Sequence, residues 1–512
     1  MPRKILPLRF DGITGDLLVT ETPQDQWTSA SNAIMREGYA QCAPGDSNGI
    51  YTGPTALNAP IHALYLPNPL TSTVVRYMVV FSDSSVYLQV TDGTTGWKDI
   101  TPTNIPGGPS GPSSTSNEMT SGIINGLPFW NWPRDFPFYW GGNYATPTVA
   151  TVLPGWPALT VCDSLRPYRD FLVAMAIYDT GGSRTGQLMW SDRGGGAIPP
   201  TWTALATNEA GDTFVGDSTG FLIDGKTLQD SFYVYKENSC YQMREIGLPT
   251  VMALRKVFDS IGCLARNCIQ DVDGMQVVVT NGDVVQHDGR SARSLIDRRM
   301  RRFLFDNMIE ADAALTYTVY DPWRKEYWIC YSADAAKDYA DQALVYNGKQ
   351  WGVRDLDGTE GMPHITTGLL PSGVETKLFG CEPNAVAAAD RLVTVNDGTF
   401  GGAGYLGTTE LVREGIRFDG FNTARVGRVW PVGEGLAGSW TSELKGDLSI
   451  GVRKGLNDSY SWSAVTTYDG TRVTPATFNR AGHDFAFKFT GAAGAVFALA
   501  GFDVEVEEGA RW

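Results

Sequence analysis

The sequence predicts an all-β protein: a β-propeller of six or so blades, with a second β-rich platform domain formed by the N-terminal arm and the C-terminal strands. Two patterns carry this prediction, a hairpin that recurs through the middle of the chain and longer alternating strands after about residue 400. The composition agrees with both, because 58 glycines, 28 prolines, 15 tryptophans and 21 tyrosines in 512 residues are typical of many short strands and turns.

The clearest hairpin lies in residues 269–289. Three valines, Val277 to Val279, precede an Asn281-Gly282-Asp283 turn, and Asn-Gly tolerates the positive φ angles that a tight turn needs. The same shape recurs in six units, with strands beginning near Met78, Phe171, Ser231, Met275, Glu326 and Thr376. Such hairpins must stack to bury their faces, as propeller blades do. The gap between Phe81 and Phe171 leaves room for one more unit near residues 129–140, so the blade count stays open.

The change of pattern along the chain predicts three segments. Residues 1–60 form an N-terminal arm, residues 61–400 the propeller, and residues 401–512 a C-terminal β domain that completes the platform. The arm has few strand signals, so it is either an element packed on other strands or a lead-in to the first blade. The C-terminal segments alternate with period two, which favours a sandwich or a sheet shared with the arm.

Charge and composition exclude some functions. With 41 basic and 56 acidic residues the net charge is −15, which disfavours tight binding of phosphates but allows DNA to pass by. No apolar run is long enough to span a bilayer, and the apolar stretch after Met1 is too short and proline-broken for a signal peptide. We therefore expect synthesis in a cytosol. Seven scattered cysteines favour reduced, buried thiols.

Searches for chemistry predict no catalytic residue, no metal site, no cofactor and no enzyme activity. Cys263 and Cys268 have no matching second pair and are expected to be core thiols, and an Asp-Gly turn accounts for residues 271–274 without calcium. Trp190-Ser191-Asp192 with Trp202 resembles an Asp-box, but the spacing is wrong, and an Asp-box is a structural turn. The four histidines are far apart in the sequence, with no second ligand at metal-binding spacing: His62, His287, His364 and His483.

An aromatic run and an exposed loop also stand out. Residues 129–140 are aromatic, proline-broken and include Arg134, so they could stack on bases or sugars. Without a flanking basic groove, a blade core or subunit contact is the favoured interpretation. The Pro/Gly/Ser/Thr-rich segment from Thr101 to Gly122 is expected to be an exposed loop.

One stretch, Ser291 to Met308, is predicted to be a basic helix. Ile296, Met300, Phe303 and Leu304 share one face at helical spacing. The other faces carry four arginines, the candidate subunit-interface or DNA-facing residues: Arg298, Arg299, Arg301 and Arg302. We favour acidic surface on a neighbouring subunit over DNA phosphates, because the overall field is negative. Charge reversal at Arg299 and Arg302 should then weaken assembly and leave the monomer folded.

In the order of its features, the whole chain resembles the tail nozzle proteins of short-tailed bacteriophages, also called tail tubular or head-to-tail stabilisation proteins. The stretches that carry the resemblance are Asn32–Gly38, Trp190-Ser191-Asp192 with Trp202, Ile261-Gly262-Cys263 leading into the Val277 hairpin, Asp288-Gly289, the Ile296 helix, Asn347–Trp351 and the strands from Phe485 to Glu508. Their order is moderately specific, and it covers nearly all 512 residues.

The resemblance implies a structural virion protein of the tail, made in the host cytoplasm. It implies a ring of six copies below a tail adaptor protein under the portal, docking of tail fibres or spikes, and a lumen that retains packaged DNA and then conducts it at ejection, without tight binding. Transient contact with the host envelope also follows from that role. The family pattern supplies no catalytic residue. The alternative function from a different class is a glycan-binding or glycan-cleaving β-propeller.

Overall fold

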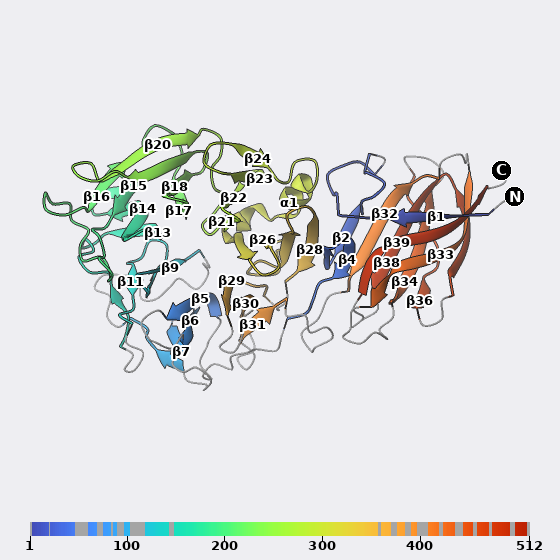
Figure 1. The fold of residues 1–512 in the computed structure, drawn as a ribbon, viewed down its shortest axis with the longest axis horizontal. Coiled ribbons are helices and arrows are strands. Elements are labelled where there is room, and N and C mark those ends of the chain that lie inside the picture. Colours follow the sequence, from blue (N-terminus) through green and yellow to red (C-terminus); the bar gives the residue numbers. More distant parts are fainter. Residues whose placement is uncertain are drawn as a thin grey trace.

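The fold comes from a computed structural model. It describes residues 3–19, 21–46, 60–68, 75–82, 85–89, 97–102, 118–142, 148–356, 360–369, 376–383, 391–396, 408–418, 423–435, 444–453, 458–470, 474–491 and 497–508. Figure 1 shows two bodies side by side: a ring of small sheets, and a platform of longer strands that carries both chain ends.

Seven small antiparallel blades build the described ring, each from consecutive strands of the chain; six are separate sheets, and the sixth blade in chain order is one end of a ten-stranded sheet. Blade 1 consists of β5 (Pro60–Asn68), β6 (Val75–Ser82), β7 (Val86–Gln89) and β8 (Trp97–Asp99). Blade 2 consists of β9 (Thr120–Ile124), β10 (Leu127–Asn131), β11 (Phe138–Tyr139) and β12 (Thr151–Val152). Blade 3 consists of β13 (Val161–Tyr168), β14 (Phe171–Asp179), β15 (Gly182–Trp190) and β16 (Gly211–Phe214). Blade 4 consists of β17 (Leu222–Leu228), β18 (Ser231–Lys236), β19 (Cys240–Glu245) and β20 (Met252–Phe258).

Blade 5 consists of β21 (Ile269–Val272), β22 (Met275–Thr280), β23 (Asp283–His287) and β24 (Ala292–Ser294). Blade 6 consists of β25 (Tyr317–Asp321), β26 (Glu326–Tyr331), β27 (Gln342–Tyr346) and β28 (Trp351–Asp355). Blade 7 has three described strands, β29 (Ile365–Leu369), β30 (Thr376–Glu382) and β31 (Arg391–Val395). The first strand of each blade contacts the first strand of the next, and β29 contacts β5. The described strands therefore form a closed β-propeller with seven blades.

The aromatic run of residues 129–140 forms the core of blade 2 and its neighbours. Trp130 is fully buried, and its ring centroid lies 5.2 Å from that of Phe81 in blade 1. Arg134 is exposed and lies over the Tyr178 ring at 5.1 Å. The blade-core interpretation is confirmed, and blade 2 fills the gap that the sequence left open. Of the predicted 101–122 loop, residues 103–117 lie outside the described residues, and Thr120 to Gly122 belong to β9.

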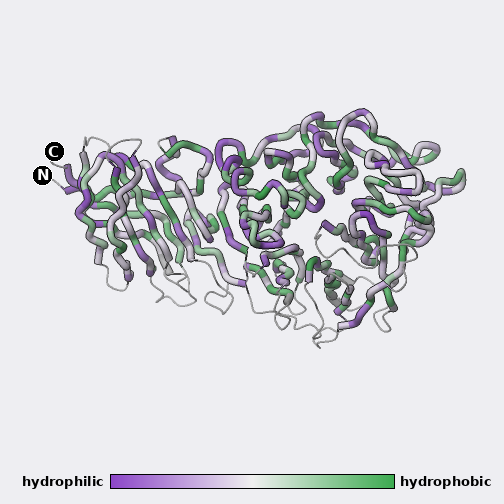
Figure 2. Tube along the Cα trace, turned by 180° about the vertical axis from the view of Figure 1, so that it is seen from behind, coloured by the Kyte–Doolittle hydropathy of each residue, from purple (hydrophilic) through white to green (hydrophobic). Residues whose placement is uncertain are grey.

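Two sheets face each other in the platform. One contains β1 (Lys4–Arg9), β3 (Ala33–Arg36), β4 (Tyr39–Cys42), β33 (Ala424–Gly435), β37 (Ala476–Gly482) and β39 (Phe497–Glu508). The other contains β2 (Ser29–Ser31), β32 (Glu410–Ile416), β34 (Lys445–Arg453), β35 (Ser461–Trp462), β36 (Thr466–Asp469) and β38 (Asp484–Gly491). Apolar and hydrophilic residues alternate along these strands (Figure 2), as expected when one face of each sheet is buried.

The core between the two sheets is aromatic, with Phe487 stacked on Phe502 at 5.5 Å and Phe489 against Phe497 at 5.2 Å. Both chain ends share these sheets, since β1 and β4 pair with β39 and β2 pairs with β32. The shared platform is therefore present. Despite its few strand signals, the arm contributes four short strands. Three of them pair with C-terminal strands, and β3 pairs with β28.

The first platform sheet continues into the propeller, because β3 pairs with β28 of blade 6 through Ala33 and Val353. Buried and half-buried charges surround this pairing. Arg36 Nε donates to Glu326 Oε1 at 2.6 Å, and Arg354 is paired with Asp46. Asn396 donates its backbone N–H to Asp46 Oδ1 at 3.1 Å and its Nδ2–H to Glu326 Oε2 at 3.3 Å. We call these five residues the junction cluster: Arg36, Asp46, Glu326, Arg354 and Asn396.

The predicted basic helix is shorter than expected. The α-helix α1 covers only Arg301–Asn307, and a 3-10 helix, η1, follows at Glu310–Leu315. Residues 292–294 form β24 instead, since the Leu295 N–H still bonds to the Val284 carbonyl of the same blade at 2.9 Å. Arg298 has a φ of 57°, which interrupts any helix through it. Ile296, Met300 and Leu304 are nevertheless fully buried, as the apolar face predicted.

All seven cysteines are buried and unpaired with one another, in agreement with the expected buried thiols. Within the described ranges, the helices are too short and too polar to cross a membrane.

Candidate functional site

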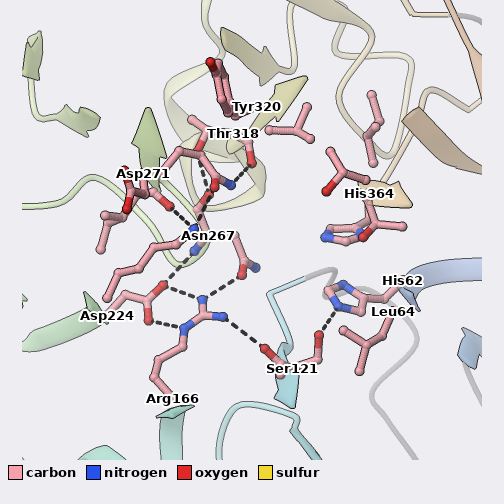
Figure 3. Close-up of a pocket in the computed structure, with 18 of the residues that line it drawn as sticks. His62, Leu64, Ser121, Arg166, Asp224, Asn267, Asp271, Thr318, Tyr320 and His364 are labelled. Atoms are coloured by element: carbon pink, nitrogen blue, oxygen red, sulfur yellow. Dashed lines mark hydrogen bonds and ion pairs between the residues drawn. The ribbon is translucent and has the colours of Figure 1, made fainter. Parts of the chain in front are cut away.

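The propeller axis contains a cavity of about 430 Å³. Residues from the first strand of every blade, or from next to it, line the cavity, so it exists only because the ring closes. Figure 3 shows His62 and His364 on one side and Arg166, Asp224, Asn267 and Asp271 on the other. Most of the lining residues are polar, although apolar atoms make up slightly more of the lining surface, and the volume falls in the range of small-molecule sites.

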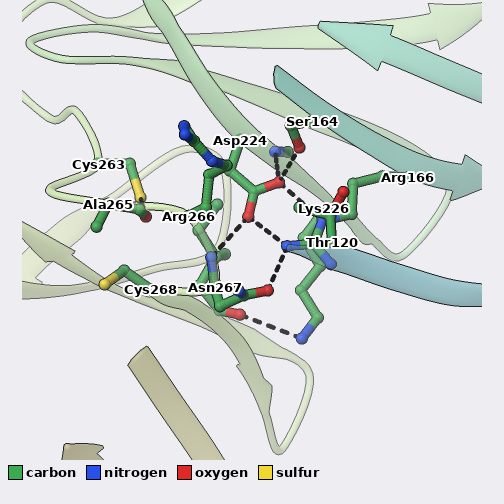
Figure 4. A network of polar contacts seen from close by, with 12 residues as sticks. Thr120, Ser164, Arg166, Asp224, Lys226, Cys263, Ala265, Arg266, Asn267 and Cys268 are labelled. Atoms are coloured by element: carbon green, nitrogen blue, oxygen red, sulfur yellow. Dashed lines mark hydrogen bonds and ion pairs between the residues drawn. The ribbon is translucent and has the colours of Figure 1, made fainter. Parts of the chain in front are cut away.

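An ion pair between blades 3 and 4 forms one wall. The Arg166 guanidinium donates to both oxygens of Asp224, at 2.7 and 2.6 Å, and to Asn267 Oδ1 at 2.8 Å (Figure 4). Asp224 also accepts from the Ser164 hydroxyl at 2.8 Å and from the backbone N–H groups of Gly225 and Asn267 at 2.8 and 3.0 Å. Five donors therefore saturate this buried carboxylate.

These donors set the charge of Asp224. Desolvation by burial acts to raise its pKa, but the Arg166 guanidinium and the backbone N–H groups outweigh burial and hold the pKa below its ordinary value. Asp224 is thus an anion with no proton to donate near neutral pH, which excludes it as a general acid. Asp271, which also lines the cavity, is exposed and accepts the N–H of Gly274 at 3.1 Å.

Lys226 projects into the same cavity from β17. Its Nζ donates to the Ile269 carbonyl at 3.1 Å and to Gln270 Oε1 at 2.6 Å, and both acceptors are uncharged. Desolvation, followed by the nearby Arg166, lowers the pKa of Lys226 to about 8. In the part of the chain that the structure describes, no carboxylate lies within ion-pair distance of this ammonium group.

Two histidines that are distant in the sequence meet at the axis. The His62 and His364 rings stack with centroids 3.7 Å apart. His62 Nε2 bonds to the Ser121 hydroxyl at 2.8 Å, and His364 Nδ1 accepts the Ala63 N–H at 3.5 Å. Burial lowers the pKa of both rings, that of His364 to about 3, so both are neutral at pH 7. Sequence reasoning missed this pair because only ring closure brings β5 and β29 together.

The four predicted arginines lie on a different surface, around the start of α1. Arg299 Nη1 donates to the Lys349 carbonyl at 2.9 Å, and Arg302 Nε pairs with Asp306 at 2.9 Å. Arg298 and Arg301 make no side-chain ion pair with any described residue. The Asp16 carboxylate from the arm accepts the N–H groups of Arg301 and Arg302 at 2.7 and 2.8 Å. We call Arg298, Arg299, Arg301 and Arg302 the arginine patch.

The weaker motifs are structural. The Asp192 N–H donates to the Thr201 carbonyl at 2.9 Å, and Trp202 packs on Trp156 at 4.7 Å. Asp273 and Gly274 have φ angles of 51° and 80°, as a tight hairpin turn requires. Among the described residues, no group of histidines, cysteines and acidic residues is arranged to hold a metal ion.

Comparisons with known proteins give only distant likenesses. No family model and no curated protein matches the chain. A crystal structure of BBS1N in complex with ARL6DN, soaked with lead, is 12% identical with a TM-score of 0.38, covering 70% of this chain and 98% of that one. The N-terminal domain of Nup159 is 10% identical with a TM-score of 0.37, covering 71% and 98%.

A third structure covers more of this chain. It is the extracellular domain of the putative hybrid two component system BT3049 from B. thetaiotaomicron, 9% identical with a TM-score of 0.42. It matches 90% of this chain and 57% of its own length. At these scores the likenesses carry no argument about function.

Proposed function

We propose that this chain is a structural subunit of a viral tail nozzle, the distal part of a DNA-conducting tail channel. The observation that carries the proposal is the insertion of a closed propeller into a platform built from both chain ends. This is the arrangement that the resemblance to tail nozzle proteins implies. In this role the protein retains packaged DNA, lets it pass at ejection, and offers surface for tail fibres or spikes.

Rigidity of the single chain supports a mechanical role. The β3–β28 pairing and the buried junction cluster join platform and propeller, so a load on one body reaches the other without a flexible linker between these strands. Removing one partner of a buried, hydrogen-bonded ion pair is strongly destabilising, so these pairs favour one fixed arrangement of platform and propeller. A wedge of this kind can repeat around a ring.

Charge supports passage of DNA without tight binding. The net charge is −15, whereas tight phosphate binding depends on a basic surface that displaces the counterions condensed on the DNA. The arginine patch is the local exception, and we assign it to contact with an acidic surface on a neighbouring copy. The proposed partners are five further copies, a tail adaptor protein below the portal, and fibres or spikes.

Light scattering coupled to size exclusion, with negative-stain images, tests the proposal. The expected particle is a ring with about six times the 55.7 kDa mass of one chain. A protein that stays monomeric at every concentration, even with its adaptor present, would overturn the proposal.

The second candidate, a glycan-binding or glycan-cleaving propeller, is favoured only by the polar axial cavity. Cleavage would need two placed carboxylates, and Asp224 is already saturated. Turnover of a surface polysaccharide that one carboxylate substitution abolishes would favour this candidate over the first.

A further inference from the structure

The axial cavity is lined by two cations, Arg166 and Lys226, and two carboxylates, Asp224 and Asp271, but only Arg166 and Asp224 are in direct contact. Arg166 and Asp224 neutralise each other within one bidentate pair, and the remaining donors on Asp224 are uncharged. Asp271 is exposed, so solvent screens it. Lys226 is held by a carbonyl and an amide oxygen, and it is the cation among the described lining residues that no carboxylate contacts directly. Asp224 and Asp271 act on its charge only at longer range.

The donors around Lys226 are arranged for a ligand that accepts hydrogen bonds. An ammonium group has three N–H donors. Two of those of Lys226 donate to Ile269 and Gln270, which leaves the third for a ligand. His364 accepts the Ala63 N–H at Nδ1, so the neutral ring carries its proton on Nε2 and remains a donor there. Thr366 and Thr367 of β29 are also among the residues that line the cavity.

We propose that the axial cavity binds a small oxyanion, a carboxylate or a phosphate, whose charge is matched by Lys226. Lys226 is half-buried and has no carboxylate in contact, so an anion placed beside it supplies a direct ion-pair partner. Charge-assisted hydrogen bonds from the ammonium group hold the anion.

The ligand and a proton bind together. Desolvation, followed by Arg166, lowers the pKa of Lys226 to about 8 against the opposing effect of the Asp224 and Asp271 carboxylates, and an adjacent anion raises this pKa further. The protonated form is the one that binds, so affinity is highest below pH 8. It falls by about tenfold for each pH unit well above 8, as the free ammonium group loses its proton.

The test uses the full-length chain and two probes, inorganic phosphate and glucuronate, at constant ionic strength in a zwitterionic buffer. Trace acylation at pH 8, read by mass spectrometry, reports the reactivity of each lysine. We expect saturable protection of Lys226 and a rise in Tm with one or both probes, and no protection of Lys98, which lies exposed on β8. Protection by phosphate alone identifies a phosphate site, and by glucuronate alone an acidic-sugar site.

Variants separate charge from shape. Lys226→Met should weaken binding by about tenfold or more, Lys226→Arg should retain it, and Lys98→Met is the matched control. Circular dichroism checks that each variant is folded. If a variant does not fold, the acylation of Lys226 in the unaltered protein still tests the site. Absence of protection and of any Tm shift at tens of millimolar probe, or equal binding by Lys226→Met, would overturn the site. Ring assembly is measured separately, so neither result depends on the proposed nozzle function.

Discussion

Val278 shows how strongly one residue constrains a blade. It lies in the middle of β22, fully buried, opposite Ile269 on one side and Val285 on the other. Val278→Asp would bury an unpaired carboxylate, which costs about 3 kcal/mol or more. We expect a large fall in the urea midpoint, or no soluble protein. Ala292→Asp, at an exposed position of β24 in the same blade, is the control and should change stability by about 0.5 kcal/mol at most. A folded Val278→Asp protein of normal stability would mean that the side chain faces solvent.

His364 makes stability depend on pH. Burial lowers its pKa to about 3 in the folded protein, whereas an unfolded histidine has a pKa near 6.5. Below about pH 6.5 the unfolded chain therefore binds a proton that the folded chain does not, so stability falls as the solution is acidified toward pH 3. For a single group this slope is at most about 1.4 kcal/mol per pH unit.

The comparison is between the unaltered protein and His364→Asn, whose amide oxygen can still accept the Ala63 N–H. Urea unfolding at pH 5 to 8 gives the difference in free energy of unfolding. Between pH 8 and 7 this difference should stay constant, and from pH 6.5 to 5 it should change by about 1 to 2 kcal/mol against the unaltered protein. Two parallel curves over the whole range would contradict the assignment of this proton to His364.

At the scale of elements, turn residues and strand periodicity predicted the hairpins, because those depend on residues that are close together in the sequence. The Asn281-Gly282 turn and the valines before it identified blade 5, and the six predicted hairpins all belong to described blades. The fragments β2, β3 and β4 were missed, since three or four residues give little periodicity and their outer partners, β32, β28 and β39, are all distant in the sequence. The helix was over-extended because the buried Ile296 and Met300 fit helical spacing while the backbone is still leaving β24.

The axial site had no sequence signal at all. His62 belongs to the first blade and His364 to the start of the last, and only closure of the ring stacks them at 3.7 Å. Arg166 and Asp224 sit in different blades for the same reason. Neither pair has a spacing that repeats or matches a motif. Such sites depend on topology, which a single sequence specifies only through the whole fold.

The arginine patch yields the prediction at this scale. Arg299 and Arg302 already have contacts within the chain, so the residues available to a neighbouring copy are Arg298 and Arg301. Replacing them by Arg298→Asn and Arg301→Gln should leave the monomer folded, because Asn tolerates the positive φ at position 298. If the patch contacts acidic surface, the dissociation constant of the assembly should rise several-fold, and less so at high salt.

Analytical ultracentrifugation at two salt concentrations measures this effect. The charge-matched control is Lys98→Gln with Arg184→Gln, two exposed positions on other blades. Unchanged assembly in the arginine variant would reject the interface role. Equally weakened assembly in both variants would mean that net charge alone, and not contact through the arginine patch, causes the effect.

For the whole molecule, the central question is whether propeller and platform behave as one unit. The chain leaves the platform at Asp46 and is back beside it at Asn396, and the junction cluster ties these two points together. Arg354, 3% exposed, has only Asp46 as its ion-pair partner in the described chain, and its guanidinium lies 5.2 Å over the Trp328 ring. The two bodies are thus joined where the propeller is entered and left, as a rigid wedge requires.

Asp46→Ala tests this coupling directly. The substitution leaves Arg354 as a buried cation without its carboxylate, which destabilises by about 3 to 5 kcal/mol. Because the loss falls at the junction, we expect calorimetry to resolve two transitions, with the platform and the propeller unfolding separately, where the unaltered protein shows one. Arg3→Ala, which removes an exposed partner of Glu505 on the platform, is the control and should keep a single transition with nearly unchanged Tm. A single transition in Asp46→Ala would show that the β3–β28 pairing alone couples the two bodies, and the cluster would then have no part in making the wedge rigid.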